Sequence, residues 1–136
     1  MIDISARKFL NKNGLDYPHG TGHGVGYFLN VHEGPIAISK GYKIKLKPGH
    51  VISNEPGFYK KGKFGIRIEN MIYVKQVKNK VFFENLTMVP IDKELINFKL
   101  LNRGEKNYLL NYNLRIYSTV EKYLNYKEKF WLLSQF

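Results

Sequence analysis

The chain has 136 residues, which suits one domain or part of one, and a formal net charge of +11. An apolar share of 43% and an aromatic share of 15% exclude a disordered tail. No apolar run approaches the roughly 18 residues of a membrane span. The absence of cysteine excludes disulfides, thiolate metal sites and cysteine nucleophiles. The first residues lack the order of a signal peptide, so we predict a cytoplasmic protein.

The positive charge suggests two interpretations. A basic domain can bind nucleic acid through a clustered cationic face. Here the cations are mostly lysines that spread from Lys8 to Lys129, which is typical of a solvated surface. Nucleic-acid binding is therefore the weaker alternative, and no membrane partner is expected.

The N-terminal region predicts a short helix followed by irregular chain. Residues 4–13 form an amphipathic pattern, with Asp3 as the expected N-cap and Gly14 as the stop. Residues 17–26 hold five Gly or Pro, so this segment must be irregular. Residues 25–31 are expected to be extended.

Strand signals dominate the middle of the chain. Residues 43–47 alternate polar and apolar side chains, which predicts a half-buried strand, and Pro48 and Gly49 then form a turn. Strands are also expected at 50–54 and 65–74, with a hairpin connection at 60–63. A further strand is expected at 81–89.

The last third of the chain predicts helix. Between residues 105 and about 124, apolar side chains recur at intervals of three and four, at Leu109, Tyr112, Ile116, Val120 and Tyr123. Residues 130–136 form a short apolar tail that we expect to dock on the domain.

Three histidines within fourteen residues form the first candidate site. His19, His23 and His32 lie in or beside a glycine-rich stretch, where the lack of Cβ atoms lets the backbone approach a ligand or a strand closely. A single histidine would most simply be a hydrogen-bonded core residue. Three together favour a functional pocket.

Two carboxylates and an arginine form the second candidate site. Glu55 lies among apolar residues that suggest burial, and a buried carboxylate needs a cation, an arginine or a metal. Alternation along a strand places Arg67 and Glu69 on one face. They could form a surface ion pair, or Glu69 could face a metal while Arg67 orients a carboxylate. Imidazole with two carboxylates suits Mn, Zn, Co or Fe ions.

Together these segments resemble the C-terminal part of the Xaa-Pro aminopeptidases, the aminopeptidase P family of pita-bread metallopeptidases. The likeness is carried by GLDY (14–17), HGTGHGVG (19–26), FLNVHEGP (28–35), NEPG (54–57), GIRIEN (65–70) and FENLTMVPI (83–91). It implies an α+β fold: the C-terminal half of a pita-bread fold, with an antiparallel curved sheet, flanking helices and a helical tail. Residues 1–100 would be a partial catalytic domain, and 101–136 a helical extension.

The resemblance also implies roles for the candidate residues. His23, Glu55 and Glu69 match metal ligands in a site that holds two divalent ions, most often Mn²⁺. His19, His23 and His32 match substrate-binding positions, and His19, His32 and Arg67 match catalytic ones. The implied reaction is hydrolysis of the bond between an N-terminal residue and a following proline.

Two aspartate ligands of that family site have no match in this chain, since Asp3 and Asp16 fall at other positions. The resemblance therefore implies a fragment of the enzyme, which alone would have little or no activity. Its partners would be a peptide with proline in second position, a separately encoded N-terminal fragment and a second copy in a homodimer. Prolidase is the nearest enzymatic alternative, and a non-catalytic pita-bread relative is another.

Overall fold

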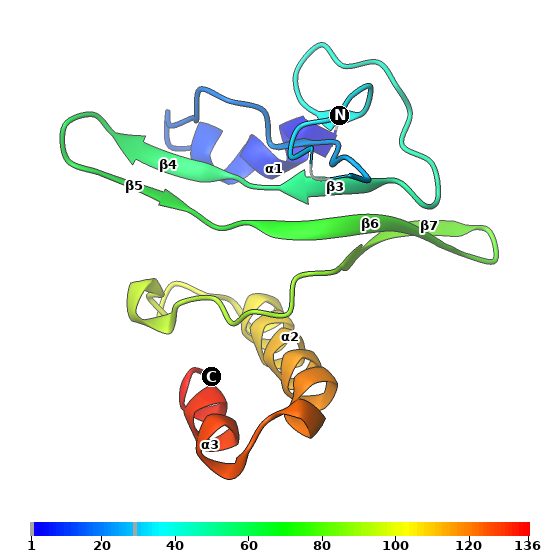
Figure 1. Cartoon of the computed structure of the whole chain (residues 1–136). Helices are drawn as coiled ribbons and strands as arrows, with labels where there is room; N and C mark the ends of the chain where they lie inside the picture. Colours follow the sequence, from blue (N-terminus) through cyan, green and yellow to red (C-terminus); the bar gives the residue numbers. More distant parts are fainter. Residues whose placement is uncertain (1, 29) are drawn as a thin grey trace. The chain divides into compact units, whose positions relative to one another are not determined.

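The computed structural model describes residues 2–28 and 30–136, and the chain forms two compact units, Met1–Thr87 and Met88–Phe136 (Figure 1). Each unit has its own cluster of buried apolar side chains. The predicted division into a partial catalytic domain, 1–100, and a helical extension, 101–136, concerns function and stays a prediction.

The first unit combines one helix with antiparallel strands. Strand β1 pairs with β2, β4 pairs with β5, and β3, β6 and β7 form a three-stranded sheet with β6 in the middle (Figure 1). The elements are α1 (Ile2–Asn11), β1 (Gly22–His23), β2 (Ala37–Ile38), β3 (Val51–Asn54), β4 (Gly57–Lys60), β5 (Phe64–Arg67), β6 (Asn70–Val77) and β7 (Lys80–Asn85).

The ladders β3–β6 and β4–β5 continue one another across a short interruption. Asn54 pairs with Asn70 on one side of it, and Gly57 pairs with Arg67 on the other, in the same register. Pro56 lies inside the interruption and has no N–H to donate to a ladder. The chain is thus freed from regular pairing at this one point, on both strands.

The turn between β4 and β5 confirms the predicted hairpin at residues 60–63, where Gly62 has a positive φ of 70°. One predicted strand is wrong, because residues 43–47 form no strand. The described part of 25–31, predicted to be extended, is irregular chain outside any ladder. Of the two apolar residues in the alternation at 43–47, Leu46 packs against the core and Ile44 is exposed, and a ladder would also need a neighbouring strand that a local pattern cannot supply.

The predicted N-cap is also wrong. Asp3 lies inside α1, as the second residue of the helix, and is only 6% exposed. Its carboxylate accepts hydrogen bonds from Arg7, one turn later, and from Thr21. A partner eighteen residues away along the chain is outside the reach of helix-start rules, which consider only neighbouring residues.

The core of the first unit is small and mixed in character. Ile38, Ile52 and Ile72 form its apolar cluster. Four polar or charged residues are buried in the same unit: Asp3, Thr21, Ser53 and Glu55. Because unpaired polar groups are costly to bury, their hydrogen-bond partners should indicate what this unit is built to hold.

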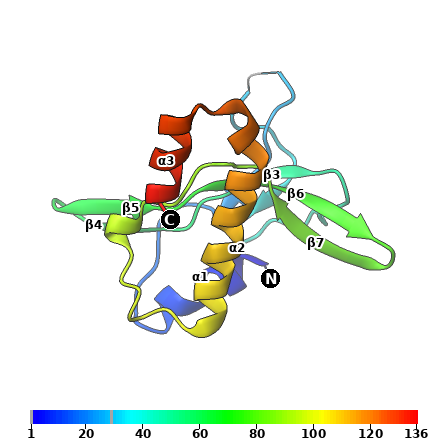
Figure 2. The same ribbon diagram turned by 90° about the horizontal axis from the view of Figure 1, so that it is seen from below.

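The second unit is helical, as predicted. It contains η1 (Lys93–Leu95), α2 (Arg103–Val120), η2 (Glu121–Tyr123) and α3 (Tyr126–Ser134). Helices α2 and α3 lie side by side in Figure 2, and Tyr112, Ile116 and Leu132 form the cluster between them. Both helices begin with a complete capping box, from Asn102 and Asn125. The predicted apolar tail is therefore part of a helix.

The architecture is α+β with antiparallel strands and a helical C-terminal part. Among the residues that the structure describes, none of the helices has the length and apolar character needed to cross a membrane.

Candidate functional site

A hollow of about 330 Å³ in the first unit gathers five of the six predicted site residues. Glu69 is the sixth, and it does not line this hollow. The lining residues are His19, Gly20, Gly22, His23, His32, Ala37, Ser39, Tyr42, Glu55 and Arg67. The glycine-rich segment, β2, the end of β3 and the end of β5 thus converge on one place.

Glycine allows the histidine segment to reach β3. A Cβ atom added at Gly22 would lie only 1.9 Å from the carbonyl oxygen of Ser53, so no other residue fits there without moving the strand. The amide of the next residue, His23, donates to the hydroxyl of Ser53 at 3.0 Å. This close approach carries the His23 side chain to the carboxylate of Glu55.

The imidazole of His23 is fixed by its backbone. Its Nδ1 lies 2.9 Å from the carbonyl oxygen of Gly24, which can only accept, so Nδ1 carries the hydrogen. In the neutral ring, Nε2 then presents a lone pair, and it lies 3.1 Å from Oε1 of Glu55. Two lone pairs at this distance need a proton or a metal cation between them. The ring of His32 lies against this ring, tilted by 35° and with centroids 3.9 Å apart.

His19 belongs to a hydrogen-bond chain whose direction is also defined. Its Nδ1 donates to the carbonyl oxygen of Gly20 at 2.7 Å, so Nε2 accepts from the hydroxyl of Tyr59 at 2.8 Å. That hydroxyl in turn accepts from Nε of Arg67 at 2.8 Å. His19 and Arg67, predicted separately, are therefore joined through one phenol oxygen.

Tyr59 is a site residue that sequence reasoning missed. It lies on β4, two residues after Gly57 of the NEPG segment, and its side chain lies beside that glycine. A Cβ atom added at Gly57 would come within 2.6 Å of the Tyr59 hydroxyl oxygen. The signal available in the sequence was an aromatic residue two positions after a glycine, on the same strand face. That pattern is too common to have been decisive.

Arg67 is the cation of the site. The hydrogen bond with Tyr59 holds the pKa of the Arg67 guanidinium above its ordinary value, and the charges of Glu55 and Glu69 act in the same direction. Its Nη1 lies 3.5 Å from Oε2 of Glu55. Glu55 is thus flanked by His23 on one oxygen and by Arg67 on the other.

Glu69 lies in the interruption between β5 and β6 and is exposed. Continuing the common register of the two ladders places it opposite Glu55. Like charges directly opposite each other on paired strands are destabilising unless a cation lies near them. Here Arg67 supplies one positive charge.

The donor set fits a divalent cation only in part. One imidazole and one carboxylate are in contact, and a carbonyl oxygen orients the imidazole, as is usual for metal-binding histidines. Across residues 2–28 and 30–136, no group of three or more His, Cys, Asp or Glu side chains is close enough to hold an ion. The ligand set of His23, Glu55 and Glu69 therefore stays a prediction.

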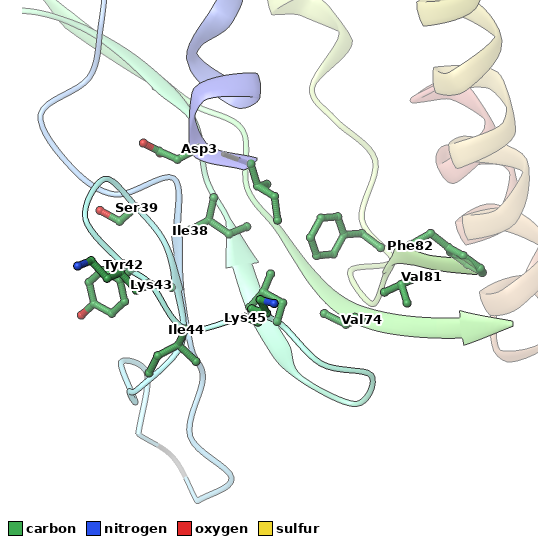
Figure 3. Close-up of a pocket in the computed structure, with 14 residues that line it drawn as sticks. Asp3, Ile38, Ser39, Tyr42, Lys43, Ile44, Lys45, Val74, Val81 and Phe82 are labelled. Carbon is green, nitrogen blue, oxygen red and sulfur yellow. The ribbon is translucent and has the colours of Figure 1, made fainter. Parts of the chain in front are cut away.

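A larger hollow of about 650 Å³ lies beside the site and has a different chemistry. Figure 3 shows the side chains of Ile38, Val74, Val81 and Phe82 around it. It shares Ala37, Ser39 and Tyr42 with the site hollow, so these three residues border both hollows. None of the predicted site residues lines it, and its apolar walls suit packing better than catalysis.

Comparison with known sequences defines the class of protein. The pattern of metallopeptidase family M24 matches residues 1–76, and that of the C-terminal region of peptidase M24 matches residues 80–135. The chain belongs to metallopeptidase family M24.

Individual relatives narrow the resemblance. The protein named Probable Xaa-Pro aminopeptidase P from Botryotinia fuckeliana is 51% identical over 133 residues, which cover 90% of this chain and 20% of that protein. The crystal structure of X-prolyl aminopeptidase from Caenorhabditis elegans, described as a cytosolic enzyme with a di-nuclear active site, is 41% identical. It matches with a TM-score of 0.89 over 98% of this chain and 23% of its own.

Prolidases are similar over a smaller part of the chain. Prolidase from Pyrococcus furiosus is 35% identical and matches with a TM-score of 0.55 over 63% of this chain and 24% of its own. The chain thus spans about a fifth of the length of the curated relative described above. Its fold is that of the C-terminal part of the pita-bread aminopeptidases, as the sequence predicted.

Proposed function

We propose that this chain forms part of the catalytic domain of a dinuclear-metal Xaa-Pro aminopeptidase. Its substrates are peptides with proline in second position, and it hydrolyses the bond before that proline. The observation that carries the proposal is the contact between Nε2 of His23 and Oε1 of Glu55, in which the hydrogen of the ring lies on the other nitrogen.

In this proposal His23, Glu55 and Glu69 are metal ligands. When bound, divalent ions, for which we propose Mn²⁺, would polarise the scissile carbonyl and activate water. Ser53 connects two of these residues, because its hydroxyl donates to Oε1 of Glu55 at 3.1 Å and accepts from the amide of His23. The shared register of the two ladders, which continues to Glu55 opposite Glu69, supports the inclusion of Glu69 in the set.

The other residues of the hollow act on the substrate. His19 and His32 lie on its wall with His23, and His19 is held by Tyr59 in one tautomer. Arg67 orients Glu55 and balances the charge of the two carboxylates. A bond to proline needs such a dedicated site, because its nitrogen has no hydrogen for the contacts that ordinary peptides make.

Completion of the site requires further carboxylates from outside these 136 residues. We propose that the rest of the catalytic domain, on the same or a separately encoded polypeptide, covers the apolar hollow of Figure 3 and supplies them. Three residues border both hollows, Ala37, Ser39 and Tyr42, which supports a partner that covers the larger hollow next to the site. We also propose a cytoplasmic location, which the cytosolic relative supports, and a homodimer, which oligomeric state in solution would test.

The decisive experiment places this chain in an enzyme that is otherwise complete. Residues 1–136 replace the matching segment of the Caenorhabditis elegans X-prolyl aminopeptidase, and hydrolysis of an Xaa-Pro-containing tripeptide is measured with Mn²⁺. We expect activity, and a loss of about 100-fold or more when Glu55→Gln is introduced, since ligand substitution should exceed the effects of supporting residues. Glu94→Gln, at an exposed position in η1, is the matched control and should change nothing.

Two results would contradict the proposal. A folded graft without activity would favour a non-catalytic relative, and a Glu55→Gln graft as active as its parent would remove Glu55 from the ligands. Turnover of Xaa-Pro dipeptides in place of longer peptides would favour a prolidase. The isolated chain assayed with Mn²⁺ should show little or no turnover, and robust turnover there would show that the missing carboxylates are not required.

The weaker alternative rests on charge alone. Binding to generic DNA or RNA that falls steeply with salt would support a nucleic-acid-binding domain. The positions of the lysines do not favour it, because they spread along the chain from Lys8 to Lys129.

A further inference from the structure

A second polar cluster surrounds Arg7 of α1 and is connected to the site through the backbone of His19. Its Nε donates to the carboxylate of Asp3 at 3.0 Å, and its Nη1 donates to Asp16 at 2.7 Å and to the carbonyl oxygen of Tyr17 at 2.8 Å. Its Nη2 donates to the carbonyl oxygen of His19. One guanidinium thus binds two carboxylates and two backbone carbonyls of the segment that carries the site histidines.

The electrostatics of this cluster keep it charged. Partial burial lowers the pKa of the Arg7 guanidinium, but hydrogen bonds to Asp16 and Asp3 outweigh burial and leave that pKa above its ordinary value. The same bond from Arg7, aided by the amide of Tyr17, holds the pKa of Asp16 below its usual range. The guanidinium also lies over the Tyr17 ring, 3.9 Å from its centroid.

The buried hydroxyls extend the cluster to Thr21. The Thr21 hydroxyl donates to Asp3 at 2.6 Å and therefore accepts from the hydroxyl of Tyr17. Asp3, Thr21 and Tyr17 are at most 6% exposed. A fully bonded network in such a place is rigid, because breaking any link leaves a buried group unpaired.

The opposite edge of the same segment is bound to β3. The amide of Glu55 donates to the carbonyl oxygen of Thr21 at 2.7 Å, and the amide of His23 donates to the Ser53 hydroxyl. The segment from residue 17 to residue 23 is therefore held by α1 at its beginning and by β3 at its end. The backbone carbonyl of His19 is bound from the α1 side, by the guanidinium of Arg7.

We propose that Arg7 is a positioning residue of the site. By binding the carbonyl oxygens of Tyr17 and His19 it fixes the backbone at which His19 is aligned between Gly20 and Tyr59, and so it sets the tautomer of His19. This inference deepens the proposed function, since it concerns the same pocket, but it can be tested without peptidase activity. It requires the geometry of a guanidinium, because an ammonium group cannot reach these divergent acceptors together.

The test uses the whole 136-residue chain and long-range ¹H–¹⁵N NMR of its imidazoles, which separates the two tautomers. In the parent protein His19 should carry its hydrogen on Nδ1. His50 supplies an internal reference of the opposite kind, because its Nδ1 accepts from the amide of Lys47 at 3.1 Å. In Arg7→Lys the separation between the two nitrogen shifts of His19 should collapse toward that of a mixed population, while His50 is unchanged.

Lys8→Ala is the matched control, because Lys8 is an exposed cation on the same helix, and it should leave both histidines as in the parent. A folded Arg7→Lys chain with the His19 signals of the parent would overturn the proposal, since it would show that positive charge alone is sufficient.

A second measurement decides the matter if Arg7→Lys does not fold. In the parent protein the Nη hydrogens of Arg7 should exchange slowly with water, and those of exposed Arg103 quickly. Fast exchange at Arg7 would equally overturn the proposal. Neither readout depends on metal or substrate, so failure here and failure of the proposed peptidase function remain distinguishable.

Discussion

The two units of this chain are stabilised in contrasting ways. In the second unit the buried residues among those described are Tyr112, Ile116 and Leu132, from two helices with complete capping boxes. In the first unit four buried residues are polar or charged, and the apolar cluster consists of three isoleucines. Local signals and apolar packing account for one unit, whereas long-range hydrogen bonds account for much of the other.

The contrast distinguishes buried residues that mainly stabilise the fold from buried residues that mainly position chemical groups. Burying Ser53 and Glu55 gains little stability, because bonded polar groups return only a small net energy relative to water. It does place an imidazole and a carboxylate in contact, which an apolar core could not do. The interior of the first unit is thus polar enough to form a site, whereas the interior of the second is apolar and stabilises its own helices.

The largest effect is expected where the contrast is simplest, in the helical unit. Ile116→Ala removes a side chain that is 0% exposed and should lower the free energy of unfolding by about 2–5 kcal/mol. Urea unfolding followed by the fluorescence of Trp131, the single tryptophan and a residue of α3, measures this. Leu114→Ala, exposed on the same helix, should cost less than about 1 kcal/mol, and equal losses would contradict the core assignment.

A buried hydroxyl should have the next largest effect, in the first unit. Ser53→Ala leaves the His23 amide without its acceptor, removes one donor to Oε1 of Glu55 and should cost about 1–3 kcal/mol. Hydrogen exchange of the β3 and β6 amides reports on this unit. Ser118→Ala, an exposed serine on α2, is the control and should stay within about 0.5 kcal/mol of the parent.

Two Asn→Ala substitutions near the start of α2 should change the stability of the second unit in opposite directions, because only one of them removes a helix cap. Asn102→Ala removes the side chain that accepts from the Glu105 amide and should destabilise the second unit by about 1 kcal/mol. Asn107→Ala, exposed within the same helix, should stabilise it slightly, because alanine is the better helix former. Thermal unfolding of both variants checks this, and a loss in both would mean that the cap is not what matters.

The smallest effect is a dependence on pH. The pKa of Asp16 is lowered by its bond with Arg7, so its contribution to stability is present above the unfolded value of about 3.9 and is lost as pH falls through the lower, folded value. Asp16→Asn should therefore lower the melting temperature slightly at pH 7. That difference should vanish toward pH 2, and a difference that grows in acid would contradict the assignment.

Sequence reasoning succeeded where the determining interactions are local. The periodic helix around Tyr112 and Ile116, the hairpin at Gly62 and the turn at Gly49 all follow from neighbours a few residues apart, and all are confirmed. The convergence of His23 with Glu55 was also predicted, although it spans the sequence, because several short motifs pointed to one family arrangement.

The failures have one physical cause in common. The carboxylate of Asp3 is bound by Thr21, eighteen residues away, instead of capping the helix, and residues 43–47 form no strand because no neighbouring strand pairs with them. Tyr59 was overlooked because its value depends on His19 and Arg67, which reach it from separate segments. Contacts between distant parts of the chain decide each case, and no local pattern reports them.

The segment that carries the histidines has a consequence for how this chain can vary in length. Its hydrogen bonds go to two sides. Arg7 binds the carbonyl oxygens of residues 17 and 19. On the other side, the Ser53 hydroxyl accepts from the amide of residue 23, and the Glu55 amide donates to the carbonyl oxygen of residue 21. A single inserted or deleted residue there would put every later group out of phase with its anchor. The length of this stretch is therefore fixed by its anchors on both sides.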